Sequence, residues 1–206
     1  LSTPSLRNIN ARNVAADAGV HSSHLSSDHH LKLKEASPYG SLPNWSTDGF
    51  IAKSNDDLRQ EMFVMQLIAF YSEIFHADNC NAWLKTYHVL NTGKSTGAIQ
   101  LIRGSSSIDA VKKCDEYPGT LRSWFIHIFG TEEEKTLYDQ KAAGVDVLMG
   151  KESPNLAAAI TRYVQSLAGY SIICYLLAIK DRHNGNIMLS DDGRIVHIDF
   201  GFVFGI

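Results

Sequence analysis

The chain has 206 residues, of which 44% are hydrophobic and 20% are charged. This composition is typical of a folded globular protein and excludes a collagen, a coiled coil or a wholly disordered chain. Its 19 Lys and Arg residues against 22 Asp and Glu residues give a net charge of −3, so no overall positive field favours nucleic acid or an anionic membrane. We therefore expect no nucleic-acid partner, and an anionic ligand has to be bound by a local group of residues.

The apolar runs and the cysteines indicate whether the chain crosses a membrane and in which compartment it is found. The longest strongly apolar run, Ile172 to Ile179, is far shorter than the ~20 residues that cross a bilayer, which predicts no transmembrane helix. The three cysteines lack the close spacing of a zinc site or a disulfide framework and indicate a reducing, cytoplasmic compartment.

The N-terminal part of the chain changes character near Leu31. Residues 1–30 are rich in Ser, Asn and His without a regular apolar period, which predicts a flexible leader. The segment from Ser37 to Trp45 combines prolines, a glycine and two aromatic residues, as is typical of a tight turn held by packing. Phe50 to Lys53 then has the pattern of a short strand.

A long apolar helix and a hairpin are predicted next. Ser54 to Asp57 favour a helix start, and the two rows of apolar residues that follow predict a helix buried on most of its surface. Tyr87–Leu90 and Ala98–Ile102 are strand candidates, separated by Thr and Gly residues that are typical of a turn.

The segment Arg103–Ser107 interrupts this pattern, and we interpret it as a hinge between two lobes. Beyond it the sequence predicts helices over Leu121–Phe129 and Asn155–Ile179, the second opened by Ser153 and Pro154. The apolar end of the second helix is expected to lie in the core.

A run without apolar residues, Lys180–Asn186, follows this helix. Burying these polar groups would cost free energy unless the site requires them for a polar function. A predicted β-hairpin comes next and ends at Asp199-Phe200-Gly201. If Asp192-Gly193 is a two-residue turn, Asn186 lies directly opposite Asp199; if Gly193 forms a bulge, Asp199 lies one step from the partner of Asn186.

In both registers Asn186 and Asp199 start from the same end of one hairpin. An amide and a carboxylate at this separation can share a hard divalent cation whose other ligands are phosphate oxygens, which predicts a Mg²⁺ site that could also take Mn²⁺. Asp181 precedes Asn186 by the offset that separates the base and the metal-binding Asn in protein-kinase catalytic loops, so Asp181 is the candidate base. His183 is a candidate donor to the transferred phosphoryl group, although Asp181–Arg182 could instead be an ion pair and His183 a packing residue.

Three motifs carry a resemblance to a known family: Lys53–Glu61, Asp181–Asn186 and His197–Gly201 resemble those of the phosphatidylinositol 3-/4-kinase family. Ser37–Trp45 is most similar to its 4-kinase branch. The resemblance implies an α+β, two-lobed protein-kinase-like fold, with an N-terminal lobe over 31–103 and a partial C-terminal lobe over 104–206. It also implies transfer of the ATP γ-phosphate to the inositol 4-hydroxyl of phosphatidylinositol, with ATP and Mg²⁺ as cofactors.

The same resemblance assigns roles to individual residues. Residues 32–40 would form the phosphate-covering loop, and Lys53 would contact the ATP phosphates. Within that loop, the nucleotide-binding residues would be Ser37, Pro38, Tyr39 and Gly40. Glu61 would face the site, Tyr87 would lie at the back of the nucleotide pocket, and Gln100, Leu101 and Ile102 would lie beside adenine. Asn186 and Asp199 would bind the metal ion, and Asp181 and His183 would act in catalysis.

Three further expectations follow from the family. Its members continue past the position of Ile206 with the activation loop that reads the inositol headgroup, so we expect a truncated C-terminal lobe and weak or absent turnover. The segment Gly130–Glu152 is interpreted as a surface insertion. The lipid substrate implies peripheral association with Golgi membranes through other regions or recruiting proteins. A related giant Ser/Thr protein kinase and a non-catalytic nucleotide-binding fragment remain as alternatives.

Overall fold

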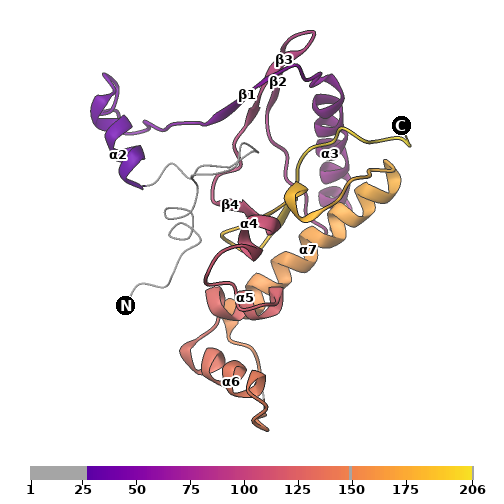
Figure 1. Ribbon diagram of the computed structural model, residues 1–206. Coiled ribbons are helices and arrows are strands. Elements are labelled where there is room, and N and C mark those ends of the chain that lie inside the picture. The colour runs from indigo at the N-terminus through magenta and orange to yellow at the C-terminus, as the bar shows by residue number, and fades with distance from the viewer. Residues whose placement is uncertain (1–26, 149, 206) are drawn as a thin grey trace.

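The computed structural model describes residues 27–148 and 150–205, which form two three-stranded antiparallel sheets and a set of helices (Figure 1). Residues 1–26 of the leader expected over 1–30 lie outside the described residues. Helix α2 (Ser27–Ala36) begins inside the segment predicted to be flexible. The expected start of order at Leu31 is therefore too late, and the strong helix formers in Leu31–Ala36 explain the helix.

The first sheet contains β1 (Phe50–Ser54), β2 (Val89–Gly93) and β3 (Thr96–Gln100), in the order β1-β3-β2. The predicted hairpin is present, but its turn is shorter than expected and both strands are displaced toward it. Gly97 belongs to β3, where it pairs with Lys53 and Asn91, and a Cβ there would lie 2.4 Å from the carbonyl oxygen of Leu90. This glycine marks a close approach of two backbones and not a turn.

Helix α3 (Arg59–Ala77) follows β1 and packs one face against the core through Val64, Met65 and Ile68. The two predicted apolar rows, which run from Leu58 to Ala69 and from Val64 to Phe75, are buried or half-buried, but Phe63 and Phe70 belong to neither row and are 47% and 56% exposed. The expectation of a mostly buried helix was wrong because an apolar pattern shows where apolar residues lie but not whether another element covers them.

The second sheet contains β4 (Ser105–Ser107), β5 (Ile187–Ser190) and β6 (Ile195–His197), in the order β4-β5-β6. The supposed hinge is thus partly a strand, with Ser105 opposite Ser190. Three successive serines carry no alternation of apolar and polar residues, so the sequence gives no strand signal there.

The hairpin of β5 and β6 has the bulged register of the two alternatives considered above. Ile187 pairs with His197, and Gly193 has a φ of 92°. The backbone nitrogen of Ile198 donates to the carbonyl oxygen of Asn186 at 3.1 Å. Asp199 therefore lies one residue beyond the partner of Asn186.

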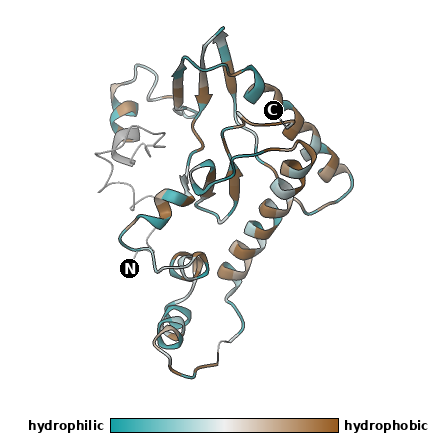
Figure 2. Cartoon of the chain, turned by 45° about the vertical axis from the view of Figure 1, so that its right-hand side comes forward, coloured by the Kyte–Doolittle hydropathy of each residue, from teal (hydrophilic) through white to brown (hydrophobic). Residues whose placement is uncertain are grey.

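Four further helices follow β4 in the chain: α4 (Ile108–Lys112), α5 (Leu121–Phe129), α6 (Glu132–Ala142) and α7 (Pro154–Leu176). Capping boxes at Thr120 and Thr131 start α5 and α6. Helix α6 buries none of its residues and is largely hydrophilic, which agrees with a surface position for 130–152 (Figure 2). The last predicted residues of α7, Leu177–Ile179, lie beyond its end.

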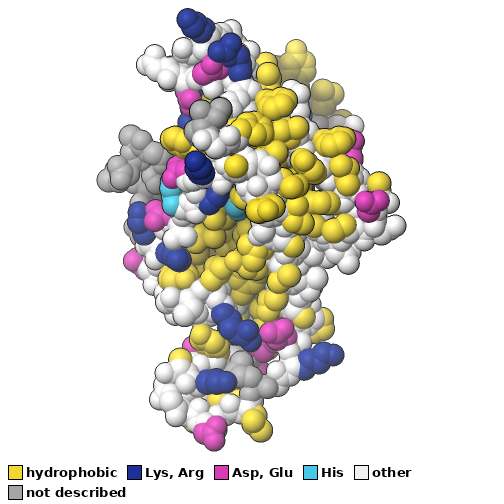
Figure 3. Space-filling view, turned by 90° about the vertical axis from the view of Figure 1, so that its right-hand side faces the viewer, with side chains coloured by type: hydrophobic (Ala, Val, Ile, Leu, Met, Phe, Trp, Pro, Cys, Tyr) yellow, Lys and Arg dark blue, Asp and Glu magenta, His cyan; other side chains and the backbone are white. Residues whose placement is uncertain are grey.

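The core lies between α7, α5 and the second sheet, where Trp124, Tyr170 and Ile173 are almost fully buried. The opposite side of α7 is exposed, with Tyr175 85% accessible, so the expectation that the whole apolar end lies in the core was wrong. Hydrophobic side chains gather on the face formed by α3 and α7 (Figure 3). Among the described residues, no helix combines the length and apolar character required to span a bilayer.

Candidate active site

A cavity of about 340 Å³ lies between the two sheets and the start of α3, within the range of about 300–1,000 Å³ for small-molecule sites. Both sheets contribute to its lining, and most of the predicted nucleotide and metal residues meet there. These are Lys53, Glu61, Tyr87, Gln100, Leu101, Ile102, Asn186 and Asp199.

Lys53 enters the cavity from β1, opposite Gly97 of β3. Its Nζ lies 3.8 Å from Oδ2 of Asp56, and both side chains are partly exposed. An ion pair this long and this exposed holds a side chain weakly. The ammonium group is therefore available to an anionic ligand.

Glu61, on α3, is paired with Tyr87 and not with Lys53. The Tyr87 hydroxyl donates to Oε1 of Glu61 at 2.6 Å. Burial raises the pKa of Glu61, the hydrogen bond from Tyr87 opposes this change, and the nearby Asp199 carboxylate raises the pKa further. Burial also raises the pKa of Tyr87 well above its ordinary value, so its hydroxyl stays protonated as a donor.

Gln100, Leu101 and Ile102 border the cavity at the end of β3, where the backbone is partly committed to other contacts. The backbone nitrogen of Gln100 donates to the carbonyl oxygen of His88 at 2.8 Å, and that of Leu101 donates to Gly49 at 2.8 Å. These bonds fix the path of the segment, so its side chains form a wall of defined position for a flat apolar group.

Asn186 and Asp199 provide the oxygen atoms predicted for a metal ion. Asn186 is buried, and its Nδ2 donates to the carbonyl oxygen of Asp181 at 3.1 Å, which leaves Oδ1 for a cation. Asp199 is exposed to the cavity and has a φ of 60°, in the left-handed region. No group of three or more His, Cys, Asp or Glu residues suited to a metal occurs in the described ranges. One amide and one carboxylate fit a cation whose remaining ligands come from phosphates.

Asp181 and His183 lie beside the cavity without lining it. Asp181 is connected to the metal residues through Asn186, whose Nδ2 also lies 3.4 Å from Oδ2 of Asp181. Nδ1 of His183 accepts a hydrogen bond from the backbone nitrogen of Gly185 at 3.0 Å, so in the neutral ring Nε2 carries the proton. That Nε2 lies 3.8 Å from Oδ2 of Asp181.

Arg182 does not form the ion pair with Asp181 that the sequence allowed. Its guanidinium donates to the carbonyl oxygen of Ile198 at 2.7 Å and to that of Asp199. It also lies 5.3 Å from the ring centroid of Phe200. Arg182 thus holds the backbone at Asp199, the predicted metal ligand, and nothing in the sequence pattern predicted this role.

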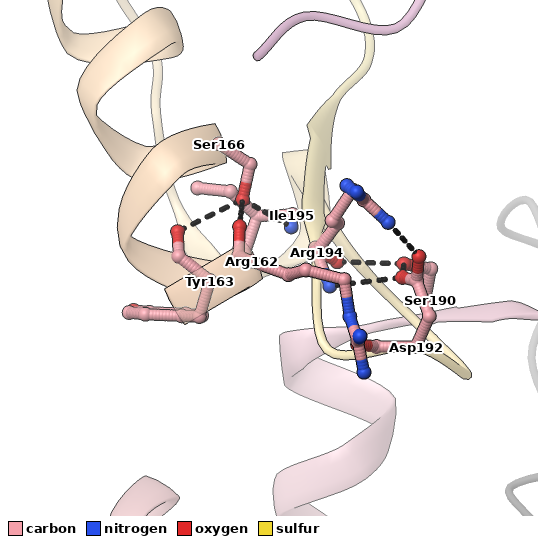
Figure 4. Close-up of polar contacts among 7 residues, drawn as sticks. All are labelled: Arg162, Tyr163, Ser166, Ser190, Asp192, Arg194 and Ile195. Atoms are coloured by element: carbon pink, nitrogen blue, oxygen red, sulfur yellow. Dashed lines mark hydrogen bonds and ion pairs between the residues drawn. The ribbon is translucent and has the colours of Figure 1, made fainter. Parts of the chain in front are cut away.

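Helix α7 anchors the hairpin that is flanked by Asn186 and Asp199 (Figure 4). The hydroxyl of Ser166, which is fully buried, accepts from the backbone nitrogen of Ile195 at 2.9 Å. Beside it, the ring of His197 stacks on Tyr170 with centroids 4.5 Å apart. Burial and the positive charge of Arg182 lower the pKa of His197 to about 4, so it packs as a neutral ring.

Residues 32–40 do not line the cavity, and the prediction of a phosphate-covering loop here is not met. Residues 32–36 are helical, and Ser37, Pro38, Tyr39 and Gly40 form a turn after α2. Nε1 of Trp45 donates to Oγ of Ser37 at 3.0 Å. This local contact closes the turn on itself, which agrees with the sequence interpretation of a tight turn held by packing.

Comparison with known proteins agrees with the motifs. The model of the family "Phosphatidylinositol 3- and 4-kinase" matches residues 48–206. Phosphatidylinositol 4-kinase beta 2 of Arabidopsis thaliana is 38% identical over 175 residues, which are 84% of this chain and 14% of that protein. Phosphatidylinositol 4-kinase PIK1alpha of Candida albicans is 40% identical over 177 residues, 84% of this chain and 17% of that protein.

A mammalian relative gives the same result. Phosphatidylinositol 4-kinase beta of Sorex araneus is 37% identical over 172 residues, 84% of this chain and 19% of the relative. The chain thus spans less than a fifth of the length of these relatives. The similarity to the 4-kinase branch that the sequence motifs indicated is confirmed. The chain belongs to the phosphatidylinositol 3- and 4-kinase family.

Proposed function

We propose that this chain carries the nucleotide-binding and catalytic-loop part of a phosphatidylinositol 4-kinase, which transfers the γ-phosphoryl group of ATP to the inositol 4-hydroxyl of phosphatidylinositol. One observation carries the proposal: Lys53 of the first sheet lines the same cavity as Asn186 and Asp199, which flank the β5–β6 hairpin of the second sheet. This arrangement puts a positive charge and two metal-ligating oxygens around one space, as phosphoryl transfer requires.

The two sheets are assigned to two kinase lobes, 31–103 and 104–206. The chain turns at Gly104, whose φ is 63°, between the two sheets. Membership of the family implies ATP and a divalent metal ion, and we propose Mg²⁺, with Mn²⁺ as a substitute, because the two ligands are hard oxygens. A cation held by Asn186 and Asp199 would neutralise phosphate charge.

The remaining roles in phosphoryl transfer are proposed for side chains of the chain itself. Lys53 provides a mobile positive charge for the phosphates. Asp181, held beside Asn186, is placed to accept the proton of the attacking hydroxyl, and the Nε2 proton of His183 is available to the transferred group. Glu61 and Tyr87 close the back of the cavity as a hydrogen-bonded pair.

The names of the relatives support the lipid substrate, since each is a phosphatidylinositol 4-kinase. A lipid substrate requires work at a membrane surface, and the cytosolic face of the Golgi, reached through recruiting proteins, is the location we propose. The choice of the 4-hydroxyl rests on the same relatives.

Two measurements on the chain test this proposal. We expect ATP to raise the melting temperature only when Mg²⁺ is present, because a ligand that binds the native state stabilises it. We then expect label from γ-labelled ATP in phosphatidylinositol vesicles at a low rate, none in a Ser/Thr peptide, and none with Asp181→Asn. Transfer to the peptide would indicate the protein-kinase alternative. Binding without transfer to either would indicate a non-catalytic nucleotide-binding fragment, and no stabilisation by ATP would reject the nucleotide site.

A further inference from the structure

The backbone around Asp199 is held by two side chains that approach it from different parts of the molecule. Arg182, in the loop after α7, donates to the carbonyl oxygens of Ile198 and Asp199. Gln60, in the first turn of α3, donates through Nε2 to the carbonyl oxygen of Phe200 at 2.9 Å and to that of Gly201 at 2.8 Å. Four successive carbonyl groups are thus bound by only two side chains.

The local conformation explains why such support is needed. Asp199 has a φ of 60°, which is unfavourable for a residue with a Cβ and persists only where the surroundings enforce it. Its carboxylate makes one long contact, 3.4 Å from the backbone nitrogen of Gly201. The direction of the side chain is therefore set mainly by the backbone on either side of it.

Gln60 differs from Arg182 in where it comes from. Arg182 belongs to the same part of the chain as the hairpin and joins two neighbouring segments. Gln60 lies 140 residues before Phe200 in sequence and precedes Glu61, which also borders the cavity. A bond from Gln60 therefore fixes the position of α3 relative to the metal ligand.

We propose that Gln60 is a positioning residue for the divalent cation: by holding the carbonyl groups of Phe200 and Gly201, it aims the carboxylate of Asp199 into the cavity. This inference rests on the proposed function, since it concerns the cation of that site. Residues that orient metal ligands without touching the metal commonly change metal affinity by about 10- to 100-fold.

Gln60→Met tests the role of the donor. Methionine has nearly the same length and a comparable helix propensity, but its thioether cannot donate to a carbonyl group. Gln66→Met is the matched control, because Gln66 lies on the same helix with an exposed side chain. Gln60→Glu is the second variant. It keeps the shape of the side chain but places a carboxylate, which accepts hydrogen bonds, against the carbonyl oxygens of Phe200 and Gly201, which are also acceptors.

The first readout is the Mg²⁺ concentration at which a fixed concentration of ATP gives half of its maximal increase in melting temperature. We expect Gln60→Met and Gln60→Glu to raise this concentration about tenfold, and Gln66→Met to leave it unchanged. A residue that merely stabilised the fold would lower the melting temperature without nucleotide but leave the Mg²⁺ midpoint where it was.

The second readout needs neither nucleotide nor metal. Hydrogen exchange of a peptide covering residues 198–204 should become faster in Gln60→Met and Gln60→Glu and stay unchanged in Gln66→Met. If the unaltered chain shows Mg²⁺-dependent stabilisation by ATP and both Gln60 variants keep its midpoint and its exchange rates, this inference is wrong and the proposed function stands. If the unaltered chain shows no such stabilisation, the proposed function fails and this inference fails with it.

Discussion

The first sheet supplies Lys53 from a strand whose residues alternate between exposed and half-buried. In the second sheet, Asn186 lies just before β5, whose two middle residues are buried, and Asp199 follows β6, which is buried throughout. On the lysine side, the ammonium group forms a 3.8 Å ion pair with Asp56. On the side proposed to hold the metal ion, which we call the metal side, the backbone around Asp199 accepts several hydrogen bonds from Arg182 and Gln60.

The difference matches the needs of the two kinds of ligand. A metal ion binds oxygen atoms at narrowly defined distances, so its ligands have to be held in place. A lysine acts as a point charge on a flexible stem and can follow a phosphate group as it moves. We infer that the metal side depends on buried packing and the lysine side does not, and the following variants test this contrast.

Asp199→Asn is expected to have the largest effect. It removes the carboxylate from the metal side, while asparagine tolerates the left-handed conformation at this position. We expect Mg²⁺-dependent binding of ATP to weaken on the order of a thousandfold, about 4 kcal/mol, measured by calorimetric titration with and without Mg²⁺. Asp78→Asn, at the exposed end of α3, is the control for loss of one charge. Unchanged Mg²⁺ dependence would remove Asp199 from the metal site.

The second prediction concerns His197, which is buried against Tyr170 and Cys174 with Arg182 nearby. Its pKa of about 4 in the folded chain lies below the ordinary 6.5, so the unfolded chain binds a proton at higher pH than the native chain does. The stabilisation that the low pKa of His197 gives the folded chain is therefore complete above pH 6.5 and is lost as the pH falls from 6.5 toward 4. We expect the free energy of unfolding to fall by roughly 3 kcal/mol between pH 6.5 and pH 4.

Urea denaturation at a series of pH values measures this loss. His197→Phe keeps an aromatic ring for stacking on Tyr170 but cannot take up a proton, so its stability should fall less steeply over the same window. Equal pH dependence of the two proteins would show that His197 does not control the stability of the metal side.

Ser166→Ala is expected to have a smaller effect on the same side. The variant leaves the buried backbone nitrogen of Ile195 without its acceptor, at a cost of about 2 kcal/mol in the free energy of unfolding. Ser171→Ala is the matched control, because this exposed serine bonds only the preceding turn of the same helix, to Leu167. Its effect should stay below about 0.5 kcal/mol. Equal effects of the two variants would argue against a special role for the anchor on α7.

The contrast also shows which features the sequence could predict. Asn186 and Asp199 were brought together correctly because a hairpin register follows from turn geometry, which local residue types determine. The roles of Gln60 and Arg182 produce no pattern in the sequence, because both side chains donate to backbone carbonyl groups. Every residue has such a group, so the residue type at the acceptor position does not reveal the contact. Strand β4 was missed for a related reason, because its serines are placed by pairing with β5 and not by their own preference.

The exposed faces of α3 and α7 illustrate a second limit. Periodicity predicted both helices, with α7 beginning at Pro154 as expected. It could not predict which apolar residues would be covered, because burial depends on the neighbours of a helix in space. Phe70 and Tyr175 are exposed for this reason, although each is a large hydrophobic residue within a predicted helix.

Lys53→Met is expected to have the smallest effect and tests the other side of the comparison. The long, partly exposed pair with Asp56 contributes little, so the free energy of unfolding should change by less than about 1 kcal/mol. The affinity for ATP should fall about tenfold because one charged contact to phosphate is lost, and the Mg²⁺ midpoint should stay within about twofold. Lys94→Met, in the exposed turn between β2 and β3, controls for the loss of charge. A large loss of stability in Lys53→Met would mean that the lysine side, like the metal side, is held by packing.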